Sequence, residues 1–515
     1  MATTQPVDGD SAGTFLGHPK GLFVLFFAEM WERFSYYGMR ALLIFYLTKH
    51  WLFSDSDAGI IYGAYTALVY ITPVVGGYLA DKYLGQRKAV LFGAVLLTLG
   101  HFFMAFEGDP AAGTENNPIV YVFWLALALI IVGSGFLKAN ISVIVGQLYP
   151  RTDTRRDAAY TIFYMGINLG AAIGSLLCGY IGETYGWAYG FGLAGIGMLA
   201  GLVVFVWGKP LLLGRGEPPK QLAKKTEWSM YGVGIALVGV CWLAIQYQDM
   251  VGYVLGLFGG SLVLYVLFIA VVKLPSEERD RIFAAMFLIL TSIVFWALFE
   301  QAGSSLNLFT DRHVDRGGVP ASTFQSINAI YIILLAPVFA VTWQTLGRKG
   351  LEPSAPLKFG LGIVQVGLGF LVLVWGAQSV GMDAAVPVLF IFLIYLLHTT
   401  GELCLSPVGL SAMNRLAPSH MASLIMGTWF FASATGNFAA GLIASATGAE
   451  GVGEEAGKQV VLDVYSTVGW YAIAIGVGVM VISPLIKKLM HLDTLQDDDV
   501  GDDLLGQSEG PGEPQ

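Results

Sequence analysis

Apolar runs recur along almost the whole chain, and they restrict the fold more than any other feature of the sequence. A helix needs about 20 predominantly apolar residues to cross the hydrocarbon core of a bilayer, so the runs predict about fourteen transmembrane helices. In chain order, these helices are expected near residues 21–48, 55–80, 88–107, 118–149, 156–181, 188–208, 228–248, 251–273, 281–309, 321–346, 357–378, 385–416, 418–446 and 461–490.

The composition supports a membrane protein. The chain of 515 residues is 55% hydrophobic and 13% charged, whereas soluble proteins carry about 25% charged residues. Transmembrane β-barrels show short segments of alternating hydrophobicity, and the long runs of this chain lack that alternation. We therefore expect an all-α integral membrane protein.

The net charge of -9 gives no support for a nucleic-acid partner. Much of the negative charge lies in the C-terminal segment 491–515, whose Asp, Glu, Gly and Pro content predicts a disordered tail. Cys178, Cys241 and Cys404 all lie within apolar runs and form no CxxC pair. Because no cluster of His, Cys and Asp has the spacing of metal ligands, we expect neither a metal nor a cofactor.

Lysine and arginine residues gather in the loops on one side of the predicted membrane. Cytoplasmic loops carry an excess of these residues, and the opposite loops are nearly bare of them. This bias predicts that the N-terminal segment 1–20 and the tail 491–515 both lie in the cytoplasm. Segment 1–20 also lacks the apolar core of a cleavable signal peptide, so the first span is expected to direct its own insertion.

A polar, basic linker from Lys209 to Lys225 separates the first six runs from the rest. The two runs that follow it add two helices, and they therefore leave the sidedness of the last six unchanged. We predict a first six-helix bundle over 21–208, a linker and inserted helix pair over 209–280, and a second six-helix bundle over 281–490.

The first run carries an unusual stripe of polar side chains. At 3.6 residues per turn, its members fall within an arc of roughly 140° on one helix face. Four charges facing lipid would cost about 10 kcal/mol, so they are expected to face one another, a partner helix or a water-filled cavity. The stripe consists of Glu29, Glu32, Arg33, Tyr36, Tyr37 and Arg40.

Several motifs resemble those of known transporters. The loop Gly76–Lys88 resembles the signature of the major facilitator superfamily, and Gly347–Lys349 is a weak echo in the second half, as internal duplication would produce. The opening stripe is similar to the first-helix motif of the proton-coupled oligopeptide transporters. Further blocks that resemble this family in order are 133–142, 163–170, 295–303, 324–328 and 401–409.

The resemblance implies a fold of two pseudo-symmetric six-helix bundles around a central cavity, with the inserted pair beside them. It implies proton-driven uptake of di- and tripeptides across the bacterial inner membrane by alternating access. The expected partners are peptides, protons and the lipid bilayer, and no enzymatic activity is expected. The sequence predicts no oligomeric state.

Three charged side chains mark candidate substrate contacts. Arg33 and Lys138 could together hold a carboxylate, and Lys138 lies in mid-helix, where an unpaired ammonium is expensive. Glu402 is an isolated acid whose natural complement is an ammonium group. In the family, the matching positions receive the two ends of a peptide: Arg33, Lys138 and Tyr37 the carboxylate, and Glu402, Asn168 and Asn328 the amino group.

Other polar and aromatic residues are weaker candidates. The side chains of the peptide are expected to meet Tyr70, Trp296, Ser406 and Trp429, although core packing is about as probable for each aromatic taken singly. For Asn168 or Asn328 taken alone, a hydrogen bond between helices is as probable as a contact with the substrate.

Proton coupling requires a group whose proton affinity depends on the substrate. Glu29 and Glu32 are expected to pair with Arg33 and Lys138 until a peptide carboxylate captures these cations and frees the glutamates to take up a proton. Glu300 is the second candidate, and Arg40 is its expected partner across the two bundles.

One departure from the family concerns the second span. Some relatives carry a histidine after a tyrosine there, whereas this chain has Tyr62 followed by Gly63. Carboxylates are therefore expected to carry the proton alone. An outer gate could instead use Asp311, Arg312 or Asp315.

Three alternatives are considered. Proteins of the wider family carry nitrate or other small anions, but such substrates would not need Glu402. A nutrient-sensing receptor on a transporter fold usually has a large appended soluble domain. An intramembrane hydrolase would need a nucleophile and a base, and Ser406 has no such partner in sequence.

Overall fold

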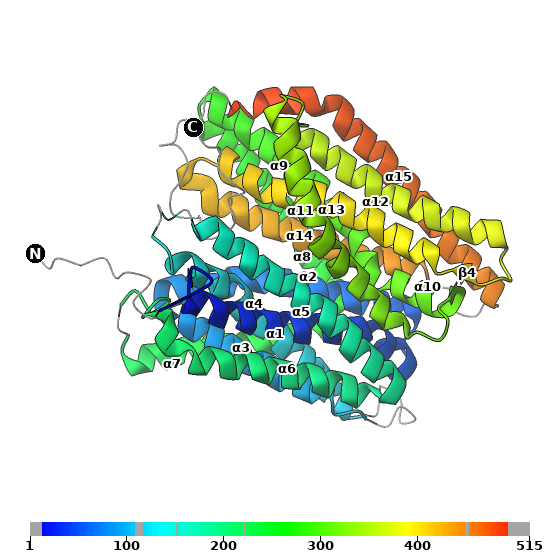
Figure 1. Ribbon diagram of the computed structural model, residues 1–515, viewed down its shortest axis with the longest axis horizontal. Helices are drawn as coiled ribbons and strands as arrows, with labels where there is room; N and C mark the ends of the chain where they lie inside the picture. Colours follow the sequence, from blue (N-terminus) through cyan, green and yellow to red (C-terminus); the bar gives the residue numbers. More distant parts are fainter. Residues whose placement is uncertain are drawn as a thin grey trace, which may run out of the picture.

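The computed structural model describes residues 13–108, 117–150, 153, 155–220, 222–448 and 453–492, and these are helical almost throughout (Figure 1). The predicted N-terminal segment 1–20 and tail 491–515 lie largely outside the described residues. An N-terminal bundle is formed by α1 (Lys20–Phe45), α2 (Asp55–Leu79), α3 (Gln86–Met104), α4 (Ile119–Gln147), α5 (Arg155–Tyr185) and α6 (Trp187–Trp207).

A C-terminal bundle contains the remaining helices of the core. Helix α9 packs against α12, α13 and α14, and α12 packs against α13 and α15. The bundle comprises α9 (Ser276–Phe299), α10 (Ser305–His313), α11 (Ser326–Arg348), α12 (Ala355–Val380), α13 (Leu389–Leu416), α14 (Ala422–Ala446) and α15 (Glu454–Leu489).

Short elements join these helices. Two π-helical turns, Tyr46–His50 and Ala80–Leu84, continue α1 and α2, and 3-10 turns occupy Lys209–Leu212, Glu300–Gly303, Ala321–Gln325 and Ser419–Met421. Strands β1 (Thr14–Phe15) and β2 (His18–Pro19) form an antiparallel pair before α1, and β3 (Val314–Asp315) pairs in parallel with β4 (Val386–Pro387).

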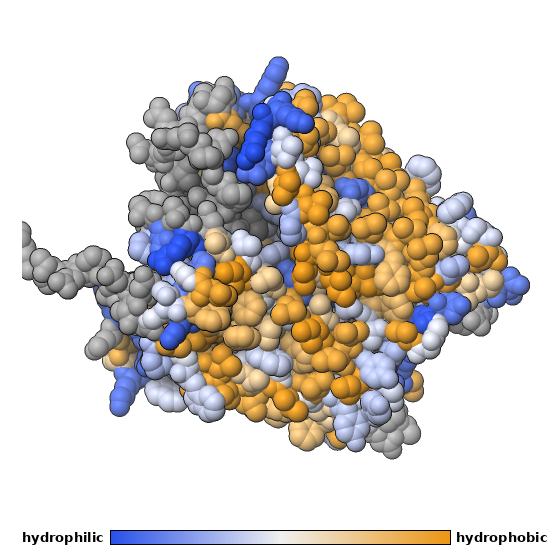
Figure 2. Space-filling model, in the orientation of Figure 1, coloured by the Kyte–Doolittle hydropathy of each residue, from blue (hydrophilic) through white to orange (hydrophobic). Residues whose placement is uncertain are grey.

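Twelve helices of the described chain are long and apolar enough to cross a membrane. Helices α1 and α14 are not among these twelve, but with 26 and 25 residues they are as long as the others. Helix α1 packs within the N-terminal bundle and α14 within the C-terminal bundle. Helix α1 is less apolar because it carries the charged stripe. Hydrophobic side chains cover the middle of the face seen in Figure 2, and hydrophilic ones gather towards its two ends. The prediction of an all-α membrane protein is confirmed.

Close backbone contacts bring the two bundles together. Helix α2 crosses α14 where Gly63 faces Gly441, and a Cβ atom added to Gly63 would lie 2.7 Å from the Gly441 Cα. Helix α5 packs against α11 through Ala171, Ala172 and Ala329. Small residues allow such close approaches between membrane helices. A histidine side chain at position 63 would overlap the backbone of α14 in this packing.

The charged stripe is held in place by another line of small residues. Gly170, Gly174, Cys178 and Gly182 recur every four residues along α5, on the face that contacts α1. A Cβ atom added to Gly38 of α1 would lie 2.6 Å from the Cys178 sulfur. The charged side chains of the stripe are themselves buried, so the stripe faces the other helices of the protein.

The inserted pair packs against both bundles, and its second helix contacts α2 of the first bundle as well as α14 and α9 of the second. Helix α7 (Lys224–Gln246) contacts α4, and its Gly234 lies against Phe92 and Phe136 of the N-terminal bundle. Helix α8 (Gln248–Lys273) contacts α14 and α9, and its glycines 252 and 259 lie against the rings of phenylalanines 438 and 431.

The linker before α7 is fixed to the N-terminal bundle. The Arg87 Nε donates to Glu217 Oε1 at 2.5 Å, and the Arg87 backbone N–H donates to the Gly216 carbonyl at 2.8 Å. This guanidinium holds the pKa of the Glu217 carboxyl below its ordinary value. Lys88 likewise pairs with Glu227 of α7 at 2.6 Å.

The predicted span 281–309 lies within one candidate membrane span, Ser276–His313, but the helix is interrupted inside it. The run 281–309 was expected to form a single helix, but α9 ends at Phe299 and α10 begins at Ser305 after a 3-10 turn. Glycine at 303 weakens the helix at this point. The apolar pattern gives no sign of the break because helical residues resume within one turn.

We expect Gly63→Ala to destabilise the protein by about 1–3 kcal/mol, because the added methyl group overlaps the backbone of α14. Its melting temperature, followed by tryptophan fluorescence in detergent, should fall by several degrees. Gly77→Ala in the same helix is the control, since an added Cβ there meets nothing within 4 Å. Equal melting temperatures for the two variants would contradict the close crossing of α2 and α14.

Candidate functional site

The stripe on α1 forms a buried ion cluster. The Arg33 Nε donates to Glu29 Oε1 at 2.7 Å and lies 3.0 Å from Glu32 Oε2. Glu29, Glu32 and Arg33 are only 1%, 0% and 3% exposed. The expectation that these charges face one another is confirmed.

Lys138 does not join this cluster as expected. Among the described residues, no carboxylate oxygen lies within 4 Å of its Nζ, which instead lies 4.5 Å from the centroid of the Tyr70 ring. The predicted direct pairing of Lys138 with the glutamates is therefore wrong. Arg33 pairs with both glutamates from the same helix, whereas the ammonium of Lys138 lies over the Tyr70 ring, a cation–π contact that leaves it without an anionic partner among the described residues.

Arg40 and Glu300 connect the two bundles. The Arg40 Nη2 forms an ion pair with Glu300 Oε2, and its Nε donates to the Tyr62 hydroxyl at 2.6 Å. Glu300 is the first residue of the turn between α9 and α10. The expected pairing of Arg40 with Glu300 is confirmed, whereas sequence reasoning missed the role of Tyr62 as a partner of Arg40.

Glu402 and Asn328 also lie together. The Asn328 Nδ2 donates to Glu402 Oε2 and to the Thr399 hydroxyl, both at 3.0 Å. Asn168 instead donates to the Tyr164 carbonyl of its own helix at 3.0 Å. The contact between α5 and α11 lies one turn or less from both asparagines, because Ala171 and Ala172 pack there against Ala329.

The remaining predicted contacts divide into two groups. Trp429 is 4% exposed and packs against Gly409 and Phe359, as core packing would place it, and its contact with peptide side chains stays a prediction. Other candidates in mid-span keep partial exposure, although they lie deep in the bundles. They are Tyr37, Tyr70, Lys138, Trp296, Asn328, Glu402 and Ser406.

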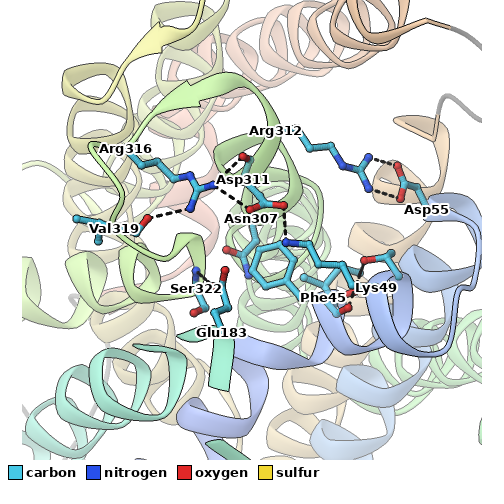
Figure 3. A network of polar contacts seen from close by, with 12 residues as sticks. Phe45, Lys49, Asp55, Glu183, Asn307, Asp311, Arg312, Arg316, Val319 and Ser322 are labelled. Carbon is cyan, nitrogen blue, oxygen red and sulfur yellow. Dashed lines mark hydrogen bonds and ion pairs between the residues drawn. The ribbon is translucent and has the colours of Figure 1, made fainter. Parts of the chain in front are cut away.

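One end of the two bundles is closed by polar contacts (Figure 3). Lys49 pairs with Asp311 at 2.7 Å, and Arg312 pairs with Asp55, the first residue of α2. Glu183 Oε1 of α5 accepts from the Ser322 backbone N–H at 2.7 Å. Each contact joins the N-terminal bundle to α10 or to the turn before α11.

Two of the three residues suggested for an outer gate lie in these contacts, namely Asp311 and Arg312. Asp315 does not, because it lies in β3 and accepts a hydrogen bond from the Gly317 backbone at 3.2 Å. Sequence reasoning missed Lys49 and Glu183, which are ordinary charges at the ends of spans. In Figure 1, α10 and β4 lie at one end of the molecule, and the C-terminal end of α15 lies at the opposite end.

A comparison with protein-family models decides the family. The model described as "POT family" matches residues 87–456, which is more than half of the chain. The chain belongs to the POT family. These are the proton-coupled oligopeptide transporters that the stripe resembles, and their major facilitator fold is the fold of this protein.

Individual relatives agree with this assignment. The chain is 39% identical to the peptide transporter YePEPT of Yersinia enterocolitica, over 84% of this chain and 88% of the relative. It is 32% identical to a dipeptide and tripeptide permease B of Aliivibrio fischeri, over 93% and 97%. A crystal structure of a POT peptide transporter in complex with alafosfalin matches with a TM-score of 0.79 and 36% identity, over 93% and 97% of the two chains.

We expect Tyr62→Phe to lower the thermal stability, because it leaves a buried N–H group of Arg40 without its partner, at a cost of about 1–3 kcal/mol. Tyr65→Phe is the control: Tyr65 lies on the same helix, and no hydrogen-bond partner of its buried hydroxyl is found among the described residues. Heating followed by size-exclusion chromatography measures both. A loss for Tyr65→Phe as large as that for Tyr62→Phe would refute the assigned partner.

Proposed function

We propose that this protein is a proton-coupled symporter that imports di- and tripeptides across the bacterial inner membrane by alternating access. The observation that carries the proposal is the separation of two sites of opposite charge. Lys138 offers an ammonium without a carboxylate partner among the described residues, and Arg33 lies on the neighbouring α1 of the same bundle. Glu402 and Asn328 offer oxygen atoms from the other bundle.

A short peptide in its zwitterionic form complements both sites. Its carboxylate can bind Arg33 through two hydrogen bonds and Lys138 as a point charge, while its ammonium can bind Glu402. The two ends of such a peptide are separated by its backbone, so the sites select length and leave the side chains free. Tyr37, Tyr70, Trp296 and Ser406 border this space, and Asn168 lies beside it.

The ion cluster on α1 supplies a route for coupling. When a peptide carboxylate attracts Arg33, Glu29 and Glu32 lose part of their neutralising charge and bind a proton more readily. Glu300 becomes a second proton acceptor whenever the bundles separate and Arg40 leaves it. Each pH unit of gradient supplies about 1.4 kcal/mol, and 100 mV of membrane potential about 2.3 kcal/mol per charge.

The sidedness follows from the basic loops. With the lysine- and arginine-rich loops in the cytoplasm, both termini lie there, and the closed end of the bundles faces outwards. The ion pairs Lys49–Asp311 and Asp55–Arg312 then form an outer gate.

The proposed function is tested by uptake of labelled dialanine into proteoliposomes, with and without a pH gradient, in competition with a tripeptide and with nitrate. We expect the gradient to drive accumulation, the tripeptide to compete and nitrate to have no effect. Glu32→Gln should abolish accumulation and preserve peptide exchange, because the remaining amide cannot carry a proton. Competition by nitrate alone would favour an anion transporter.

We expect Lys138→Ala to weaken binding of dialanine at least tenfold, because the carboxylate of the peptide loses a charged partner worth about 1.5–3 kcal/mol. Binding of C-terminally amidated dialanine should change much less. Lys82→Ala is the control, since Lys82 also lies over a tyrosine ring but is exposed. Competition binding measures all three proteins, and an equal loss for both ligands in Lys138→Ala would contradict the carboxylate site.

A further inference from the structure

The turn that carries Glu300 interrupts a membrane helix. Helix α9 ends at Phe299, the 3-10 turn Glu300–Gly303 follows, and α10 begins at Ser305. Such a break frees backbone carbonyls from their helical donors, and inside a membrane these groups need other partners. The partners of the break therefore determine where Glu300 lies.

The side chain of Gln301 supplies such a partner for one carbonyl at the end of α9 and ties the break to its neighbours. It is 0% exposed, and its Nε2 donates to the Ala297 carbonyl and to the Ala440 carbonyl, both at 2.9 Å. Its Oε1 accepts from the Ser305 hydroxyl at 2.5 Å, and this hydroxyl also contacts the Tyr465 hydroxyl at 2.8 Å. Both polar atoms of the amide are thus used.

These bonds reach four helices of the C-terminal bundle. Ala297 belongs to the last turn of α9 and Ser305 is the first residue of α10, whereas Ala440 lies on α14 and Tyr465 on α15. Ala440 directly precedes Gly441, which meets Gly63 of the N-terminal bundle. The amide therefore attaches the break to the helix that makes the close crossing between the bundles.

The other side of the break faces Arg40. Glu300 pairs with this arginine, and Gly303 lies so close to the Tyr62 hydroxyl that an added Cβ atom would overlap it. Arg40 also lies over the rings of Tyr37 and Tyr62. Glu300 thus pairs with Arg40 of the N-terminal bundle, while the neighbouring Gln301 is bonded to helices of the C-terminal bundle.

We propose that Gln301 is a positioning residue for proton coupling, which holds the helix break so that Glu300 meets Arg40 when the outer gate is closed. Gln301 itself binds neither proton nor peptide. Without its amide, the carbonyls of Ala297 and Ala440 lose a buried donor, and the break shifts to recover one. The inference rests on the proposed function, because it assigns Gln301 to the coupling step of that function.

The test compares two glutamine variants in proteoliposomes. Gln301→Leu removes the amide at similar volume, and Gln246→Leu is the matched control. Gln246 also donates to a carbonyl four residues earlier, that of Trp242 at 2.7 Å, but it lies at the end of α7, away from the break. Glu300→Gln serves as the reference. Each protein is assayed for dialanine exchange without a gradient and for accumulation driven by a gradient across a series of external pH values.

For Gln301→Leu, we expect exchange within about twofold of wild type, accumulation reduced at least tenfold, and a pH profile displaced towards that of Glu300→Gln. The double variant with Glu300→Gln should accumulate no less than Glu300→Gln alone, whereas Gln246→Leu should match wild type. Wild-type accumulation by Gln301→Leu, or an equal loss of exchange and accumulation, would overturn the inference.

Ser305→Ala keeps the inference testable if Gln301→Leu does not fold. This smaller change removes the donor to Gln301 Oε1 and should lower accumulation about threefold with exchange preserved. Unchanged accumulation in Ser305→Ala would then count against the inference. Absence of driven accumulation in the wild-type protein would instead refute the proposed function itself.

Discussion

Neutralisation of charge inside the bilayer is the constraint on which the rest of this structure depends. Water does not reach most of the ionised side chains of α1, so each must find its counter-charge within the protein. Arg33 finds two within one turn of its own helix, whereas Arg40 finds its partner only on the other bundle. The first cluster is independent of how the bundles are placed, and the second exists only when they are close.

In the proposed coupling, this difference separates two kinds of proton acceptor. There, Glu29 and Glu32 would respond to a ligand that competes for Arg33, which links their protonation to binding. Glu300 would respond to the distance between bundles, which links its protonation to conformation. A transporter that couples binding to movement needs both links, and in this proposal the attraction for the ligand comes from Lys138, which lies over Tyr70 without a carboxylate nearby among the described residues.

The sequence allowed the spans to be predicted because long apolar runs have few alternative structures. The Arg40–Glu300 pair was also predictable, since two buried charges of opposite sign must meet. The break after Phe299 was not, because it depends on hydrogen bonds of Gln301 with residues distant in sequence. The pairing of Lys138 with the glutamates was predicted wrongly, because the sequence does not show that its ammonium comes to lie over the Tyr70 ring. The division into bundles at 208 and 281 and the roles of the site residues stay predictions.

The placement of the inserted pair has a consequence for observing the protein at work. Helix α7 packs against the N-terminal bundle, whereas α8 packs against α9 and α14 and also against α2, and a single turn between Gln246 and Gln248 connects the two helices. Because α8 contacts helices of both bundles, a rocking motion has to displace it relative to one of them, and the angle between α7 and α8 is then expected to change. Spectroscopic labels at exposed positions such as Val240 and Val254 would report that angle from the lipid side, without a probe in the peptide pathway.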